Sequence, residues 1–301
     1  MRLLIAPTMN YADRDPFALK YNGKYYLVHT INASEVCVRC AESVDELPSA
    51  EPVCVFTPTD SFYNKEVWAP ELHIIGGKCY IYVAMSNGID LYHRMCILYN
   101  DSSDPQKPYK FYGIMKEAHD AWAIDGTVFE YRGKLYTVWS GRDNEKCFEQ
   151  TLYIARMKNP FELETERVKI STPEKPWELM GCKNLYTAPN VNEGAFAVEY
   201  DGKLFLLYSA SGSWDPHYCI SYLELEGTDP MDPAAWKKHD GPILVENDML
   251  FGSGHCSVIR DENEDRIFFH AWRREEKEIN WCTVSLFEGR LLNKDGKLSI
   301  E

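Results

Sequence analysis

Three acidic residues, Asp15, Asp125 and Glu193, each stand eight or nine residues before a predicted hairpin turn. A pair of carboxyl groups across a cleft is the machinery of glycoside hydrolysis: one protonates the leaving oxygen, and the other activates water or attacks the sugar. A lone acid at a strand start is explained equally well as a hairpin anchor that pairs with an arginine or a backbone N–H. Three acids at similar positions favour chemistry, because a buried charge without a partner is costly.

The element that carries each acid is a β-hairpin, and the stretch 192–209 shows it best. The acid Glu193 begins a run of aromatic and aliphatic residues, Asp201-Gly202 forms the turn, and a second such run follows. Glycine tolerates the positive φ that a two-residue hairpin turn needs. The flanking runs have the composition of paired, half-buried strands.

The same hairpin recurs along the chain. Its turns contain Gly23, Gly77, Gly133 and Gly202, and a looser fifth copy turns near Asn263, which gives intervals of 54, 56, 69 and about 61 residues. Strand pairs that repeat with a period in this range predict a propeller, whose blades usually have four strands. We therefore expect an all-β fold, a five-bladed β-propeller of four-stranded antiparallel blades, and a single catalytic domain over residues 1–301.

A propeller would bring the acids together, because the innermost strand of every blade lines the central axis. Asp15, Asp125 and Glu193 would then meet at one end of that axis. Acids on different blades flank a funnel, which favours a separation of roughly 6.5–9.5 Å, wide enough for a water molecule and for inversion. We also expect the run 281–286 to pair near the N-terminus and close the ring, which removes exposed sheet edges.

Two tryptophans are candidates for stacking on a sugar. Pro70 is expected to hold Ala69 extended, which would place Trp68 on an irregular segment just before an inner strand. A core position is the alternative for Trp68. Trp214 follows a Gly/Ser loop, which favours the rim of a pocket.

Composition excludes some partners. The 301 residues carry a net charge of −14, whereas nucleic-acid binding needs a basic face. The ten cysteines form no compact disulfide pattern, and the CxxC motif at 37–40 has no second pair for zinc, so free thiols in a reducing compartment are expected. No stretch is long and apolar enough for a membrane span. We predict a cytoplasmic location, with a trimmed secretory leader as the alternative.

Five short motifs resemble the successive blade motifs of glycoside hydrolase family 43. They are Asp15-Pro16-Phe17, Trp68-Ala69-Pro70-Glu71-Leu72, Ile124-Asp125-Gly126, Asn192-Glu193-Gly194 and Gly254-His255, and the resemblance covers about residues 10–274. It implies a five-bladed propeller that hydrolyses arabinosides or xylosides with inversion. The chain departs from the family pattern at Ala195, where proline is frequent, and at Cys256, where histidine or serine is common.

The resemblance also implies roles for individual residues. Asp15 matches the general base, Glu193 the general acid, and Asp125 the residue that tunes and orients the acid. Trp68 matches an aromatic residue near the terminal-sugar subsite. His255 matches an axial histidine, which in some members helps to hold a metal ion such as calcium, or a water.

The resemblance further suggests a substrate-facing guanidinium from Arg273 or Arg274, and no cofactor is required. We expect an inverting exo-α-L-arabinofuranosidase acting on arabino-oligosaccharides. A β-xylosidase of the same fold and a non-catalytic sugar-binding propeller are the alternatives. A phosphorolytic enzyme is less favoured, since Arg273-Arg274 is the only dense basic pair near the expected axis.

Overall fold

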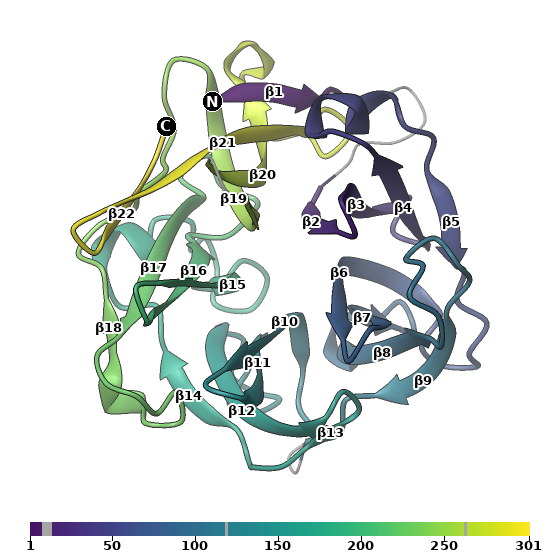
Figure 1. Cartoon of the computed structure of the whole chain (residues 1–301). Helices are drawn as coiled ribbons and strands as arrows, with labels where there is room; N and C mark the ends of the chain where they lie inside the picture. Colours follow the sequence, from purple (N-terminus) through teal and green to yellow (C-terminus); the bar gives the residue numbers. More distant parts are fainter. Residues whose placement is uncertain (8–13, 118–119, 262–263) are drawn as a thin grey trace.

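The five hairpins form the inner pairs of strands of five sheets that are arranged as blades around one axis (Figure 1). The computed structural model describes residues 1–7, 14–117, 120–261 and 264–301; the turn predicted near Asn263 lies outside them. The inner pairs are β2 (Phe17–Tyr21) with β3 (Lys24–Ile31), β6 (Lys65–Ile75) with β7 (Lys78–Ser86), β10 (Ala123–Tyr131) with β11 (Lys134–Gly141), β15 (Asn192–Tyr200) with β16 (Lys203–Ala210), and β19 (Leu250–Arg260) with β20 (Asp265–Arg273).

Outer strands complete the first four blades, and every pairing is antiparallel. They are β4 (Glu35–Ala41) and β5 (Val53–Phe56), β8 (Arg94–Asn100) and β9 (Lys110–Ile114), β12 (Thr151–Asn159) with β13 (Glu162–Leu163) and β14 (Val168–Ser171), and β17 (Cys219–Leu225) and β18 (Trp236–Lys238). Short 3₁₀ helices interrupt the connections: η1 (Val44–Ser49), η2 (Asp90–Tyr92), η3 (Pro176–Glu178), η4 (Pro233–Ala235) and η5 (Arg274–Glu276).

The fifth blade closes the ring with the two ends of the chain. Strand β1 (Arg2–Ile5) pairs with β21 (Ser285–Lys294), with Leu3 opposite Phe287, and β22 (Lys297–Ile300) pairs with the other end of β21. This confirms the predicted pairing near the N-terminus, although the strand begins at Ser285, so that residues 281–284 precede it. Both ends of the chain thus belong to one blade, and β1 covers an edge of β21 that would otherwise be exposed.

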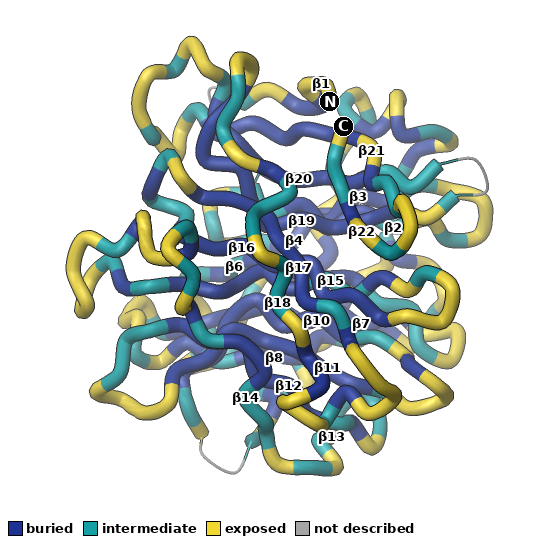
Figure 2. Tube along the Cα trace, turned by 90° about the vertical axis from the view of Figure 1, so that its left-hand side faces the viewer, coloured by how far each residue is buried: buried dark blue, intermediate teal, exposed yellow. Residues whose placement is uncertain are grey.

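The core consists of the layers between blades. Each of the five gaps between adjacent blades contains its own cluster of buried apolar side chains. The inner strands are buried along most of their length, whereas the hairpin turns are exposed (Figure 2). No helix among the described residues is long and apolar enough to cross a membrane. The blades thus hold the inner strands rigidly around the axis.

Candidate active site

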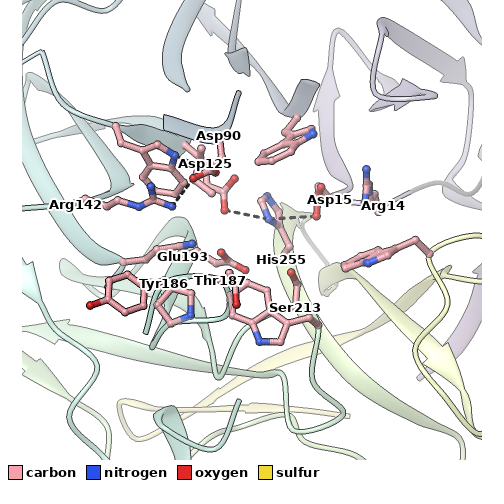
Figure 3. Close-up of a pocket in the computed structure, with 17 residues that line it drawn as sticks. Arg14, Asp15, Asp90, Asp125, Arg142, Tyr186, Thr187, Glu193, Ser213 and His255 are labelled. Atoms are coloured by element: carbon pink, nitrogen blue, oxygen red, sulfur yellow. Dashed lines mark hydrogen bonds and ion pairs between the residues drawn. The ribbon is translucent and has the colours of Figure 1, made fainter. Parts of the chain in front are cut away.

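A pocket of about 520 Å³ opens at one end of the axis and takes residues from all five blades. Asp15, Asp125, Glu193 and His255 all line it (Figure 3). Trp68 and Trp214 line it as well. The structure therefore brings together six of the eight site residues that the sequence predicted, although the three acids lie as much as 178 residues apart in the chain.

A repeated backbone distortion positions these side chains. Five residues adopt a left-handed conformation, with φ between 47° and 57°, at the same place in each blade: Asp15, Ala69, Asp125, Gly194 and His255. In the second to fifth blades the pairing of the inner strand shifts at this residue, which is the mark of a β-bulge. The conformation is unfavourable for residues other than glycine, and three of the five, Asp15, Asp125 and His255, line the pocket.

This repeat corrects two expectations. Ala69 was expected to be extended before Pro70, but its φ is +47°, and Trp68 lies within β6 rather than on an irregular segment. Glu193 was expected at the position equivalent to Asp15 and Asp125, but Gly194 occupies that position and Glu193 precedes it. Glu193 thus occupies the place that Arg14, Trp68 and Ile124 hold in three other blades, and these residues line the pocket.

His255 lies between two of the acids. Its Nδ1 is 3.4 Å from Oδ1 of Asp15 and 3.7 Å from Oδ2 of Asp125 (Figure 3). Burial lowers the pKa of His255 below its ordinary value, against the opposing effect of Asp15. The ring also limits its neighbour, because a Cβ at Gly194 would lie 3.1 Å from Nδ1.

The surroundings of Asp15 favour its ionised form. Burial by itself would raise its pKa, but the charge of His255 and the hydrogen bond with His270 outweigh burial and hold the pKa well below its usual range. Nδ1 of His270 lies 3.1 Å from Oδ1 of Asp15 and 3.2 Å from its backbone nitrogen. Arg14 adds a smaller effect in the same direction. A carboxylate that stays ionised suits a general base.

The surroundings of Glu193 favour its protonated form. Burial raises its pKa to about 7, the hydrogen bond from Tyr218 opposes the rise, and the charge of Asp15 adds to it. The Tyr218 hydroxyl donates to Oε1 over 2.8 Å. A carboxyl group that is protonated near neutral pH suits a general acid.

Asp125 interacts electrostatically with both Asp15 and Glu193. Burial raises its pKa well above the ordinary value, and the charges of Glu193 and Asp15 raise it further. Asp125 and Glu193 therefore titrate as a coupled pair, and a proton held by one favours ionisation of the other. The charge that adds to the raised pKa of Glu193 comes from Asp15, so the tuning role that the resemblance implied for Asp125 stays a prediction.

The aromatic residues form the walls of the pocket. Trp68 stacks on the buried ring of His93, with centroids 4.0 Å apart, and Trp214 donates its indole N–H to the carbonyl of Gly181 over 2.9 Å. A Cβ at Gly212 would lie 2.7 Å from the ring of Trp214, so glycine allows this packing. Both rings are held in place before any ligand binds, which suits them for stacking on a sugar.

Neither Arg273 nor Arg274 lines the pocket. Arg273 pairs with Glu275 and Glu276, and Arg274 pairs with Glu246 at 2.7 Å. The guanidinium groups that do line it belong to Arg14 and Arg142. The expectation for the Arg273-Arg274 pair depended on the strand register, and β20 ends at Arg273 as the chain turns away into η5.

Arg142, Trp122 and Asp90 form a group in the pocket wall that was not predicted from the sequence. Its guanidinium lies 3.9 Å from the centre of the Trp122 ring and pairs with Asp90 at 2.9 Å. On the opposite side of the pocket, Arg14 lies 5.0 Å from the centre of the Trp281 ring. The adjacency of Arg14 to Asp15 was visible in the sequence, but no local pattern pointed to Arg142.

Tyr218 and His270 were also missed, although both contact the acids. Tyr218 immediately precedes β17, the third strand of the fourth blade, and His270 lies in β20, the second strand of the fifth blade. Neither residue therefore belongs to an innermost strand. Their rings stack with centroids 5.7 Å apart. They thus connect Glu193, through the Tyr218 hydroxyl, with Asp15, through the His270 ring.

His255 was matched to an axial histidine that in some family members helps to hold a metal ion or a water, and the side chains around it bear on the metal. Among the described residues, no group of three or more His, Cys, Asp or Glu side chains is arranged to hold a metal ion. Calcium prefers six to eight oxygen ligands, and the surroundings of His255 do not fit such a cage.

Comparison with known proteins finds a matching family and similar sequences. The family described as glycosyl hydrolases family 43 matches residues 5–285. The chain is 34% identical over 277 residues to α-L-arabinofuranosidase B of Pyricularia oryzae, covering 88% of this chain and 55% of that protein. It is 33% identical over 268 residues to the extracellular exo-α-(1→5)-L-arabinofuranosidase of Streptomyces chartreusis, covering 86% and 78%.

A solved structure is similar over almost its full length. The crystal structure of an α-L-arabinofuranosidase from Lactobacillus brevis matches with a TM-score of 0.86 and 29% identity, and the match covers 98% of this chain and 95% of that one. The chain thus spans just over half of the Pyricularia relative but nearly all of the Lactobacillus structure.

Proposed function

Because the chain belongs to glycosyl hydrolases family 43, we propose that it is an inverting exo-α-L-arabinofuranosidase that releases terminal arabinofuranosyl residues from arabino-oligosaccharides. The observation that carries the proposal is the opposite tuning of two carboxyl groups in one pocket: the pKa of Asp15 is held low and that of Glu193 is raised to about 7. Two titratable groups whose environments separate their pKa values are the usual sign of an acid and a base.

In the proposed reaction Glu193 donates its proton to the glycosidic oxygen as the bond to the anomeric carbon breaks. Asp15 accepts a proton from a water molecule, whose oxygen bonds to the anomeric carbon from the opposite face. The product has inverted configuration, and both carboxyl groups return to their starting states when Glu193 regains a proton and Asp15 loses one. Asp125, when ionised, favours the proton on Glu193 through the coupling described above.

The sugar is inferred from the relatives. The two proteins described above at more than 30% identity are named α-L-arabinofuranosidases, and one of them is named exo-acting. The pocket lies at one end of the propeller axis, and its walls, which include Trp68 and Trp214, surround the acids. This shape suits a terminal sugar. The cytoplasmic location stays a prediction, and it would favour short oligosaccharides over a polymer.

The proposal is tested with nitrophenyl α-L-arabinofuranoside and nitrophenyl β-xyloside, using the wild type and Glu193→Ala. We expect activity on the arabinoside, and a product of inverted configuration by proton NMR at early times. Activity on the xyloside alone would show that the proposed sugar is wrong and would leave the proposed roles of the acids unchanged. A folded protein that cleaves neither glycoside would favour a sugar-binding propeller.

Exo action is tested with linear arabinan and arabinotriose. We expect arabinose as the first product from both, with faster release from the triose. Internal cleavage of the polymer at a comparable rate would contradict the exo assignment.

A further inference from the structure

A buried ion pair lies behind the proposed acid, outside the pocket. Glu178, at the end of η3, is fully buried, and its carboxylate pairs with Nζ of Lys238 in β18 at 2.8 Å. Lys238 also donates to the carbonyl of Thr172 over 2.7 Å. The pair therefore joins the connector between β14 and β15 to the outermost strand of the fourth blade.

Every contact of Glu178 comes from a hydrogen-bond donor. Oε2 accepts the backbone N–H groups of Glu174 and Lys175, at 2.9 and 2.8 Å. Oε1 accepts the Tyr208 hydroxyl and the side-chain amide of Asn192, both at 2.9 Å. A carboxylate is the one side chain of this size that can accept at all of these positions.

Asn192 directly precedes Glu193, and it is fixed on every side. Its side-chain Oδ1 accepts the Ser171 hydroxyl at 2.7 Å, while its Nδ2 donates to Glu178. Its backbone N–H donates to the carbonyl of Gln150 at 3.0 Å, and its own carbonyl accepts the Ser140 hydroxyl at 2.9 Å. These contacts hold the start of β15 against the third blade.

The Glu193 carboxyl itself has little direct support. Among the described residues, it accepts a side-chain hydrogen bond from Tyr218. The following residue, Gly194, begins the bulge with φ +57°. The position of the carboxyl therefore depends strongly on how the backbone enters the bulge, and Asn192 sets that entry.

We propose that Glu178, supported by Lys238, is a positioning residue for Glu193: it holds the carboxamide of Asn192 and so fixes the backbone from which the acid reaches the glycosidic oxygen. The assignment rests on the proposed function of Glu193. A buried ion pair contributes little net stability when compared with apolar replacements, whereas placement of a general acid within a fraction of an ångström controls its rate.

The test uses Glu178→Gln and Asn192→Ala. In Glu178→Gln, whichever way the amide is turned, its N–H₂ group faces hydrogen-bond donors that the carboxylate accepted. Asn192→Ala removes the side-chain link between Glu178 and the backbone next to Glu193. Both variants are assayed on nitrophenyl arabinofuranoside, whose leaving group needs little protonation, and on arabinotriose, whose leaving group needs much. We expect kcat/KM to fall about tenfold more on arabinotriose than on the aryl glycoside.

Arg167→Met is the matched control, because Arg167 and Glu117 form another buried ion pair, at 3.4 Å, whose members do not line the pocket. We expect it to reduce both activities equally. The ratio of the two activities does not depend on the folded fraction, since unfolded protein cleaves neither substrate, so a variant that folds poorly still gives a result. Equal losses on both substrates in Glu178→Gln and Asn192→Ala would overturn the proposal.

Glu193→Gln on the same two substrates separates the possible failures. If it loses far more activity on arabinotriose and the two network variants do not, only the positioning role is wrong. If Glu193→Gln itself shows equal losses, the assignment of the acid is wrong.

Discussion

The hydroxyl of Tyr218 donates a hydrogen bond of 2.8 Å to Oε1 of Glu193. Both side chains are buried, and the tyrosine ring stacks on His270, which contacts Asp15. The bond stabilises the carboxylate form of Glu193 and so limits the rise in pKa that burial causes. Tyr218 thereby adjusts the pH at which the acid gives up its proton.

Replacement of Tyr218 by phenylalanine should move the activity profile to higher pH. The proposed mechanism requires protonated Glu193, so wild-type kcat/KM is expected to fall as pH rises through about 7. Loss of the hydrogen bond raises the pKa further, and the fall should begin at higher pH. Tyr222→Phe, a buried tyrosine in β17 outside the pocket, should leave the profile unchanged. A shift to lower pH would contradict the role given to the hydroxyl.

Gly254→Ala should disrupt the same contact by sterics. A Cβ at Gly254 would lie 1.9 Å from Cε1 of Tyr218, so the ring or the strand must shift, which should disturb the contact with Glu193. We expect a loss of stability of about 1–3 kcal/mol from overpacking, measured by urea unfolding, and a large loss of activity. Gly241→Ala is the control, because a Cβ at Gly241 would have no atom within 4 Å; the two variants should differ clearly in both measurements.

Glu193→Gln should stabilise the protein at alkaline pH. The pKa of Glu193 is raised from 4.5 to about 7 in the folded state. The contribution of Glu193 to the free energy of unfolding is therefore most favourable below pH 4.5 and is lost as pH rises through 7. Glutamine stays neutral, and the variant should gain on the order of 1–3 kcal/mol over wild type at pH 8. Thermal melting at pH 5 and pH 8 checks this: the difference in Tm should be greater at pH 8, and a reversed order would argue against a raised pKa.

Asp15→Ala should lose activity on every glycoside, because water must be activated whatever group leaves. A fall in kcat of about 10²–10⁴ is expected for both nitrophenyl arabinofuranoside and arabinotriose. This contrasts with Glu193→Ala, whose loss should be smaller on the aryl substrate. Normal turnover by folded Asp15→Ala would remove it from the role of base.

Arg142→Met should weaken substrate binding. Its guanidinium lies against Trp122 and pairs with Asp90 at the wall of the pocket. A hydrogen bond to a charged group contributes about 1.5–3 kcal/mol, so loss of Arg142 should raise KM for arabinotriose at least about tenfold. Arg273→Met, outside the pocket, is the comparison and should leave KM near the wild-type value. The opposite result would restore Arg273 as the substrate-facing arginine.

The repeated hairpins could be predicted from the sequence because their signals are local. The turns at Gly23, Gly77, Gly133 and Gly202 all have glycine at positive φ, as the pattern of turn residues between apolar runs indicated. Five such repeats predicted the propeller, and the order of the motifs predicted which acids would face its axis. The structure confirms the fold.

The chemistry of the acids was decided by tertiary structure. Their pKa values depend on burial and on His255, His270 and Tyr218, which reach them from other strands. The offset between Glu193 and Gly194 depends on a bulge whose exact residue no turn signal marks. Arg273 and Arg142 could not be distinguished by type, because a guanidinium faces the pocket or the solvent according to where its strand ends.

The sequence by itself thus determined the repeating unit, the number of blades and the three acids, since turn chemistry and alternating apolar residues act over a few positions. Only the closed ring decided which side chains meet at the axis and what charge each acid carries. Those properties arise from contacts between residues tens to hundreds of positions apart, such as Asp15 with His270, and no local pattern in the chain encodes them.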